Sequence, residues 1–251
     1  MSKHFRRRQF ILSSITGAFV TLLSSFSRKV LAQAPERVTT PSQTTDLQKS
    51  LIPQIADSKS KPVDVTEAAR RSRELNATAD EIDEALDALQ DRLILVKTPK
   101  TPNESAAGTD AVPILEVNPS TSLNSQEKQA ANNLVTAFQE KVRNGEVTAS
   151  DLQKDEQTLE FTVQTKQICS NGRVCWKFKW WGVRIRLNHC AVVWATSAGS
   201  IASLAAPPPV KLAIIFFVSV LKAFDKGCGV QIHWLWVGVS WIKSKSCSKC
   251  N

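Results

Sequence analysis

Cysteine is the residue type in this sequence that most directly suggests chemistry. The candidates for disulfide bonds are Cys169, Cys175, Cys190, Cys228, Cys247 and Cys250. Two pairings follow from the elements predicted below. Cys169 would pair with Cys175 across a hairpin, and Cys190 would pair with Cys228 across two antiparallel helices of similar length. Cys247 to Cys250 would then close locally or stay reduced.

A zinc site is the alternative use of the same residues. Cys247-Ser248-Lys249-Cys250 contains one Cys-x-x-Cys pair, whereas a structural zinc site takes four ligands from two such pairs. His189 and His233 are the residues that would complete the set, but disulfides account better for the cysteines of an exported chain. We therefore expect neither a metal nor a cofactor.

Catalytic motifs are missing from the sequence. It contains no nucleophile elbow, P-loop, dinucleotide fingerprint or zinc-protease motif. Asp225 is the only acidic residue after residue 168, which argues against a glycosidase or a metal-assisted hydrolase in this part of the chain. We expect no catalytic residues and a protein that is not an enzyme. An exported enzyme with His189, His233, Cys247 and Cys250 as metal ligands ranks third among our hypotheses.

Positive charge and tryptophan are concentrated at the C-terminal end. Residues 169–251 hold all seven tryptophans and eleven basic residues, whereas residues 35–168 hold 15 basic and 22 acidic residues. Tryptophan interleaved with lysine is typical of a membrane-interface belt, although tryptophans also fill cores and stack on sugars or bases. The predicted membrane- or envelope-binding residues are Trp176, Lys177, Lys179, Trp180, Trp181, Arg184, Arg186, Trp234, Trp236, Trp241, Lys243 and Lys245.

The elements that must position these residues indicate an α+β fold for residues 158–251. Strand-like segments over 176–189 and 229–243 flank two apolar helices over 191–206 and 210–224, which form a helical hairpin. A preceding strand with Leu159 and Phe161 inward would turn at 170–173, where Asn-Gly tolerates positive φ. The change of alternation near Trp181-Gly182 indicates a bulge. A helix needs about 20 apolar residues to span a bilayer, and each of these two is shorter. The hairpin therefore either packs in the core of the domain or inserts into a membrane as a unit.

The preceding part of the chain is predicted to hold isolated helices between largely disordered linkers. Residues 35–63 and 96–123 are rich in Pro, Ser and Thr, which indicates flexible linkers. Residues 64–95 form an acidic helical segment, with a capping box at Thr78 and Glu81. That segment either covers the basic domain or is a solvated helix. Residues 124–157 contain a further helix, capped by Asn124 and Glu127, which we expect to dock on the domain.

The first 34 residues have a basic start, an apolar run and a small-residue end, as in a cleavable export signal. The motif residues are Arg7, Arg8, Phe10, Ile11 and Ala32. Arg7-Arg8-Gln9-Phe10-Ile11-Leu12 resembles the bacterial twin-arginine export motif, although Arg6 and Leu12 depart from its usual pattern. The resemblance implies a bacterial protein that meets the twin-arginine translocase, is cleaved after Ala32 and reaches the periplasm or the exterior.

These observations together predict an exported precursor whose basic, disulfide-bridged C-terminal domain binds anionic membranes or envelope, in the manner of a bacteriocin. The partners expected are anionic lipid or an envelope polymer, and no nucleic acid. The alternative is an extracytoplasmic structural or carbohydrate-binding module in which the helical hairpin is ordinary core.

Overall fold

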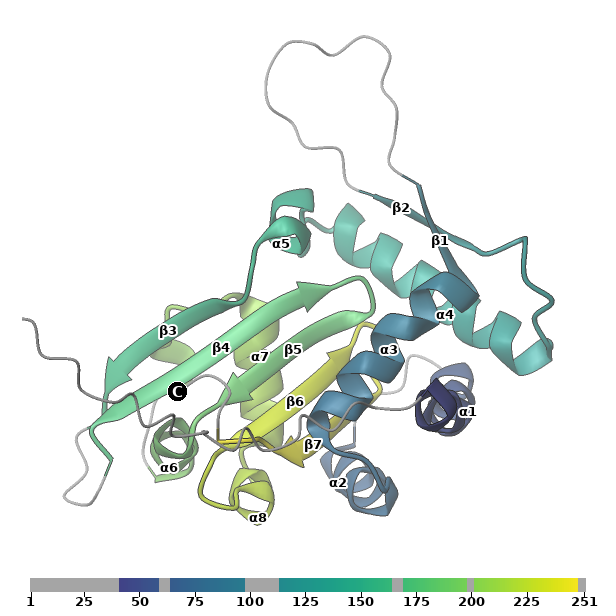
Figure 1. Ribbon diagram of the computed structural model, residues 1–251. Coiled ribbons are helices and arrows are strands. Elements are labelled where there is room, and N and C mark those ends of the chain that lie inside the picture. Colours follow the sequence, from purple (N-terminus) through teal and green to yellow (C-terminus); the bar gives the residue numbers. More distant parts are fainter. Residues whose placement is uncertain (1–40, 59–63, 98–112, 164–168, 198–200, 248–251) are drawn as a thin grey trace, which may run out of the picture. The chain divides into compact units, whose positions relative to one another are not determined.

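A five-stranded antiparallel sheet occupies the middle of the fold. The computed structural model describes residues 41–58, 64–97, 113–163, 169–197 and 201–247. The strands are β3 (Gln157–Thr162), β4 (Asn171–Lys179), β5 (Gly182–Leu187), β6 (Val230–Leu235) and β7 (Ser240–Ser244). They lie side by side in sequence order, and each pairs antiparallel with the next (Figure 1). The predicted α+β class is confirmed.

The two faces of the sheet differ in chemistry because successive side chains of a strand alternate between them. Two rows of register partners form the apolar face: Val174, Leu187 and Val230, and Trp176, Ile185, Ile232 and Ile242. Two rows form the other face, which we call the cationic face: Lys177, Arg184, His233 and Trp241, and Cys175, Arg186, Gln231 and Lys243. A sheet with these two faces requires two different covering layers.

The chain between β5 and β6 covers the apolar face. It contains α6 (His189–Ser197), η1 (Ile201–Ser203), α7 (Pro208–Phe217) and α8 (Leu221–Phe224), and Figure 1 shows α7 behind the sheet. Phe216 and Phe217 of α7 meet the ring of Trp234 edge-on, and Trp194 of α6 packs on Phe161 of β3. The side of the apolar block that faces the sheet is therefore core, whereas Leu212 and Ile215 of α7 are exposed. Among the described residues, no helix is both long enough and apolar enough to cross a bilayer.

The N-terminal helices lie on the opposite side of the sheet. α2 (Val65–Glu74) packs on β7, and α3 (Ala79–Leu93) crosses β6 and β7, in front of the sheet in Figure 1. α1 (Pro41–Ala56) and α4 (Ser125–Arg143) pack against α3 and bury its apolar stripe of Ile82, Leu86, Leu89 and Leu93. A small hairpin of β1 (Ile94–Lys97) and β2 (Ile114–Val117) packs on α4, and α5 (Ala149–Gln153) contacts β4.

The structure differs from the linker predictions within the described residues. α1 lies in the segment expected to be a flexible linker, yet Leu51 and Ile55 are fully buried. β1 likewise ends inside the second expected linker, and β2 lies wholly within it, with Leu115 buried. The Pro- and Ser-rich composition was misleading because a few apolar residues at helical spacing are enough to dock a helix on a neighbouring core. Residues 59–63 and 98–112 lie outside the described residues.

Each of the two long strands predicted from the sequence, over 176–189 and 229–243, is a pair of antiparallel strands joined by a tight turn. The bulge predicted at Trp181-Gly182 is instead a two-residue turn at Trp180-Trp181, because Lys179 pairs directly with Gly182. A Cβ at Gly182 would lie 2.0 Å from the Trp234 carbonyl oxygen, so only glycine admits this close approach of β6. The segment 229–243 reverses between β6 and β7, where Gly238 has a φ of 82°.

The turn predicted at 170–173 is also wrong. Val163 N–H donates to the Ser170 carbonyl, and Asn171 and Gly172 are strand residues paired with Thr162 and Phe161. Gly172 has a packing role here, because a Cβ at this position would lie 2.4 Å from the Phe161 ring. The helical hairpin is likewise shorter and more broken than predicted: α7 begins at Pro208, and β-branched Val218 and Val220 follow its end.

The predicted helix caps are confirmed. Thr78 and Glu81 form a reciprocal capping box at the start of α3, and Asn124 and Glu127 form one at the start of α4. Gly145, with a φ of 70°, follows the end of α4 as expected for a glycine stop signal. Local signals of this kind place the helix starts correctly because they involve residues only three positions apart.

Candidate functional site

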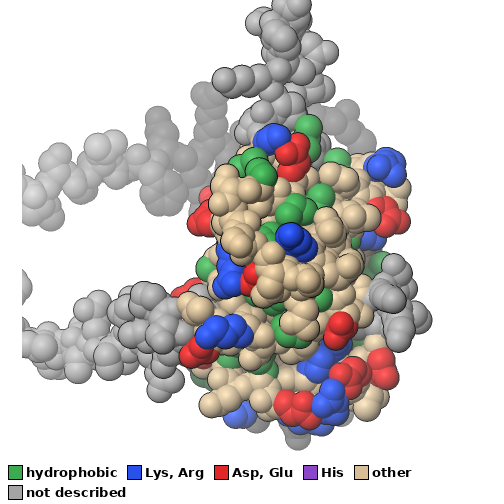
Figure 2. Space-filling model, turned by 90° about the vertical axis from the view of Figure 1, so that its right-hand side faces the viewer, with side chains coloured by type: hydrophobic (Ala, Val, Ile, Leu, Met, Phe, Trp, Pro, Cys, Tyr) green, Lys and Arg blue, Asp and Glu red, His purple; other side chains and the backbone are tan. Residues whose placement is uncertain are grey.

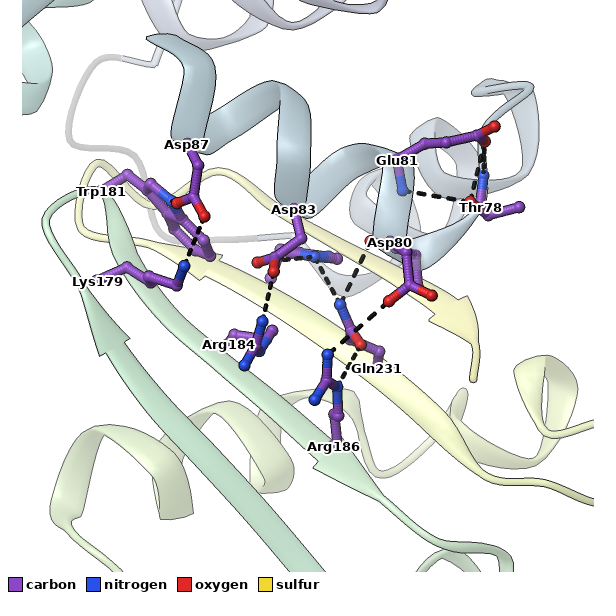
Figure 3. Close-up of polar contacts among 12 residues, drawn as sticks. Thr78, Asp80, Glu81, Asp83, Asp87, Lys179, Trp181, Arg184, Arg186 and Gln231 are labelled. Atoms are coloured by element: carbon purple, nitrogen blue, oxygen red, sulfur yellow. Dashed lines mark hydrogen bonds and ion pairs between the residues drawn. The ribbon is translucent and has the colours of Figure 1, made fainter. Parts of the chain in front are cut away.

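The contact between α3 and the cationic face is the main charged cluster of the described residues. Figure 3 shows Asp80, Asp83 and Asp87 on one side of α3 and the basic side chains of β4 and β5 below them. Asp87 accepts from Lys179 Nζ at 2.6 Å and from Trp181 Nε1 at 2.9 Å. The spacing of three and four residues puts these carboxylates on one side of the helix, facing the sheet.

Two arginines of β5 complete the charged layer. Arg184 pairs with Asp83 and, at 3.1 Å, with Glu156. Arg186, only 6% exposed, donates through Nη1 to both carboxylate oxygens of Glu156 at 2.9 and 3.0 Å, and its Nη2 lies 3.8 Å from Asp80. Lys179, Arg184 and Arg186 therefore each meet a carboxylate from the region before residue 169.

A buried glutamine and histidine connect the arginines to α3. Arg186 Nε donates to Gln231 Oε1 at 2.7 Å, and Gln231 Nε2 donates to the Ala79 carbonyl of α3 at 3.3 Å. Gln231 Nε2 also lies 3.0 Å from Nε2 of His233. Since the amide nitrogen can only donate, His233 Nε2 is the acceptor and its proton sits on Nδ1.

His233 is held neutral by its surroundings. Its side chain is fully buried, and desolvation, reinforced by Arg184, Arg186 and Lys179, lowers its pKa to about 4. Asp83, 3.9 Å from Nε2, opposes the shift only in part. The cationic face thus holds its histidine uncharged next to three permanent cations.

The edge of the face at β7 is held by a side-chain hydroxyl of α2 and by the backbone carbonyl of the residue after that helix. Ile242 N–H donates to Ser72 Oγ at 2.8 Å, and Lys243 Nζ donates to the Leu75 carbonyl at 2.5 Å. Burial lowers the pKa of Lys243 and of Lys245 below the usual lysine value. Neither lysine extends into solvent as a freely hydrated cation.

The residues predicted to form an exposed binding surface are inside the molecule instead. Buried tryptophans are Trp176, Trp180, Trp181, Trp236 and Trp241, and Trp234 is half-buried. The basic residues are buried or half-buried as well: Lys177, Lys179, Arg184, Arg186, Lys243 and Lys245. The structure brings the basic ones together on one face and places α3 over them. The acidic segment weighed above as a cover for the basic domain therefore lies on it, and Asp80, Asp83 and Asp87 face the sheet.

The cysteines pair differently from the prediction. The structure joins Cys169 with Cys190 and Cys228 with Cys247, with Cα separations of 5.2 and 4.7 Å. The chain reverses at Asn188, whose side chain accepts from the Arg173 and Ala191 amides, and this reversal brings Cys190 back over the start of β4. Cys228 and Cys247 stand just beyond the paired residues Val230 and Ser244, so the β6–β7 register brings them together.

Disulfides of this kind persist in oxidising compartments outside the cytoplasm. No cysteine of the described segments is free. The predicted closure of Cys247 with Cys250 is wrong, because Cys247 pairs with Cys228. Cys250 itself lies outside the described residues.

The histidines do not assemble into the metal site considered above. His189 Nδ1 lies 2.6 Å from Asp225 Oδ2, and the other oxygen of Asp225 accepts from the Gly227 and Gly229 amides. His233 is enclosed beneath α3, and Cys247 is in a disulfide. Within the described residues, no group of three or more His, Cys, Asp and Glu is arranged to hold a metal ion.

A groove of about 530 Å³ runs between α4 and the β6–β7 turn. One wall is formed by α4, with the uncharged polar side chains Gln129, Asn132, Asn133 and Thr136 and, at its end, the charged pair Glu140 and Lys141. Trp236, Val237 and Gly238 form part of the other wall. Figure 2 views the molecule from the side on which α1 and α4 lie in Figure 1, and shows acidic and basic side chains interspersed among uncharged ones.

Comparison with known proteins gives no relative for this chain: no family model, no curated protein and no solved structure matches it. The predicted export residues Arg7, Arg8, Phe10, Ile11 and Ala32 lie outside the described residues.

Proposed function

We propose that this chain is an exported bacterial precursor in which helix α3 covers the cationic face of the sheet. Once uncovered, the face binds anionic lipid or an anionic polymer of the cell envelope, in the manner of a bacteriocin. The observation that carries the proposal is that Lys179, Arg184 and Arg186 are each neutralised by carboxylates from the region before residue 169.

The energetics of buried charge support a covering role. Desolvating paired charges costs roughly as much as their attraction returns, so an ion-pair layer adds little net stability where an apolar core would add much. Such a layer is best suited to a surface that also exists in a second, uncovered state. The apolar stripe of α3 already docks on α1 and α4 without help from the carboxylates. The N-terminal helices can therefore act as one removable layer.

The proposal assigns binding to this site, and it assigns no reaction. The resemblance of Arg7-Arg8 to a twin-arginine motif supports the export part of the proposal, and so do the disulfides, which persist outside the cytoplasm. An envelope-binding face would otherwise contact anionic partners in the cytoplasm. Replacing Arg7 and Arg8 by lysine should leave the protein in the cytoplasm at its precursor size, as measured by fractionation and blotting. Normal export of that variant would refute the twin-arginine part.

Two charge-matched double variants test the covering role. Asp83→Asn with Asp87→Asn removes two carboxylates that face the sheet, whereas Glu84→Gln with Asp91→Asn removes two from exposed positions of the same helix. The first variant removes the α3 carboxylates that pair with Lys179 and Arg184. Each lysine or arginine at an anionic membrane contributes about 1 kcal/mol, so these two cations should strengthen binding about thirtyfold. The assay is co-sedimentation with phosphatidylglycerol vesicles at low salt, with phosphatidylcholine vesicles as the neutral comparison.

Near-ultraviolet circular dichroism shows whether each variant keeps its tertiary structure. We expect the sheet-facing variant to bind in a salt-sensitive manner and the exposed-face variant to bind like the wild type. Equal binding by the two variants would mean that net charge alone governs binding, and would refute the covering role. If the double variant unfolds, Asp80→Asn takes its place. The Asp80–Arg186 contact is longer, at 3.8 Å, so its loss should disturb the fold less.

The groove along α4 favours a second candidate, a carbohydrate-binding envelope module. Amide and hydroxyl side chains beside a tryptophan are the groups that hold neutral sugars, since they match sugar hydroxyls without charge. Binding there should survive high salt. Purified cell-wall polymer should retain the wild type but not Asn132→Ala with Thr136→Ala, two exposed positions of the groove. Loss of retention in salt would exclude this candidate.

A further inference from the structure

A second cavity, of about 430 Å³, lies at the end of the sheet between α3, the β1–β2 hairpin, α5 and the end of β4. Its volume falls within the range of about 300–1,000 Å³ that is usual for small-molecule sites. The cavity coexists with α3 in its covering position, and Gln90 of α3 contributes to the lining. A ligand here would not require the cationic face to be uncovered, so the inference does not rest on the proposed function.

The lining divides into an apolar wall and a cationic edge. Val96, Leu115 and Leu152 form the wall, and they come from three different elements. Val96 is 37% exposed, so this part of the wall is open to a ligand. Lys177 and Lys179 contribute positive charge, and Asp87, which pairs with Lys179, contributes one carboxylate.

Two polar groups of this lining have no partner among the residues that the structure describes. Lys179 is paired with Asp87, but Lys177 makes no ion pair or hydrogen bond with any part of the chain that the structure describes. Trp180 is only 8% exposed, and its buried Nε1 has no hydrogen-bond partner among the described residues. An unsatisfied buried donor costs about 1–3 kcal/mol, so an acceptor from a ligand would relieve that cost. Within the described part of the chain, the site offers one unpaired cation and one unpaired donor next to an apolar wall.

We propose that this cavity binds a single-chain anionic amphiphile, with a long-chain carboxylate as the simplest example. The carboxylate accepts from Lys177 Nζ and from Trp180 Nε1, and the alkyl chain lies against Val96, Leu115 and Leu152. A neutral chain leaves both polar groups unsatisfied, and a short carboxylate leaves the wall uncovered. The cavity therefore selects for both halves of the ligand.

Calorimetric titration of the full-length protein with monomeric dodecanoate tests the site. We expect saturable binding of one molecule per chain, and an affinity that rises about fourfold for each added methylene that the wall buries between octanoate and dodecanoate. Lys177→Gln should weaken dodecanoate binding about five- to tenfold and leave dodecanol binding unchanged. Lys222→Gln, at an exposed position of α8, is the matched control and should bind dodecanoate like the wild type.

Val96→Asp is a second variant at an exposed position that should tolerate the change, and its new carboxylate should abolish dodecanoate binding. Phosphatidylglycerol vesicles distinguish the two sources of such a ligand. If vesicles bind through Lys177 and monomeric dodecanoate also binds, the site accepts a membrane lipid chain as well as a free acid. Absence of saturable dodecanoate binding, or equal affinities of the wild type and Lys177→Gln, would overturn the proposal.

Discussion

His233 should make the protein sensitive to mild acid. Its pKa is about 4 in the folded chain and returns to its ordinary value of 6.5 on unfolding. The unfolded state therefore binds more protons between these values, and stability is complete above pH 6.5 and falls as the pH is lowered toward 4. The loss from this residue is about 2 kcal/mol at pH 5 and about 3 kcal/mol at pH 4, and it levels off below that.

Urea unfolding of the wild type and of His233→Gln at pH 7 and pH 5 isolates this contribution. Carboxylate titration affects both proteins alike, so the wild type should lose about 2 kcal/mol more than the variant between these pH values. His189→Gln changes the other histidine of the described residues and should leave the His233 loss in place. If His233→Gln and the wild type lose the same stability, the histidine is not held neutral beneath α3 and the assignment fails.

Three further predictions concern the fold. Gly182→Ala should destabilise the protein by about 2–4 kcal/mol in urea unfolding, because its Cβ would overlap the Trp234 carbonyl; wild-type stability would contradict the hairpin geometry. Cys190→Ser should lower the free energy of unfolding by about 3 kcal/mol. Peptide mapping of the wild type should recover Cys190 linked to Cys169, and a link to another cysteine would refute the pairing. Leu86→Ala should cost about 3 kcal/mol by thermal unfolding if α3 docks through its apolar stripe.

Features set by residues close in sequence could be predicted. The capping boxes at Thr78 and Asn124, the glycine stop after α4 and the alternating strand β3 all depend on neighbours within a few positions. The charge imbalance between the two halves of the chain also correctly indicated a concentrated basic region.

Features set by strand register could not be predicted. The alternation of Trp and Lys in β4 continues into β5 with its phase changed, and a bulge and a tight turn produce the same change in sequence. The choice between them decides which face Arg184 occupies and which cysteines meet. The disulfides were mispaired for that reason: Cys169 reaches Cys190 only because β5 returns antiparallel beside β4.

Burial of the charged residues was the other feature beyond the sequence. Arg186 and Lys243 have the composition of an exposed strand face, and their burial depends on partners distant in sequence: Glu156 for Arg186 and the Leu75 carbonyl for Lys243. The complementary stripe on α3 was visible, but a solvated helix has the same pattern. The contact between the two layers spans about a hundred residues of sequence, so local rules do not specify it.

Lysine footprinting tests the central claim, that α3 covers the cationic face, most directly. The full-length wild type is acetylated briefly under native conditions, and mass spectrometry compares Lys179 and Lys243 with exposed Lys222. We predict slow modification of the first two in the wild type and fast modification in the Asp83→Asn, Asp87→Asn variant, with protection restored by phosphatidylglycerol vesicles. If Lys179 reacts as fast as Lys222 in the wild type, or if vesicles restore no protection in the variant, the account is wrong.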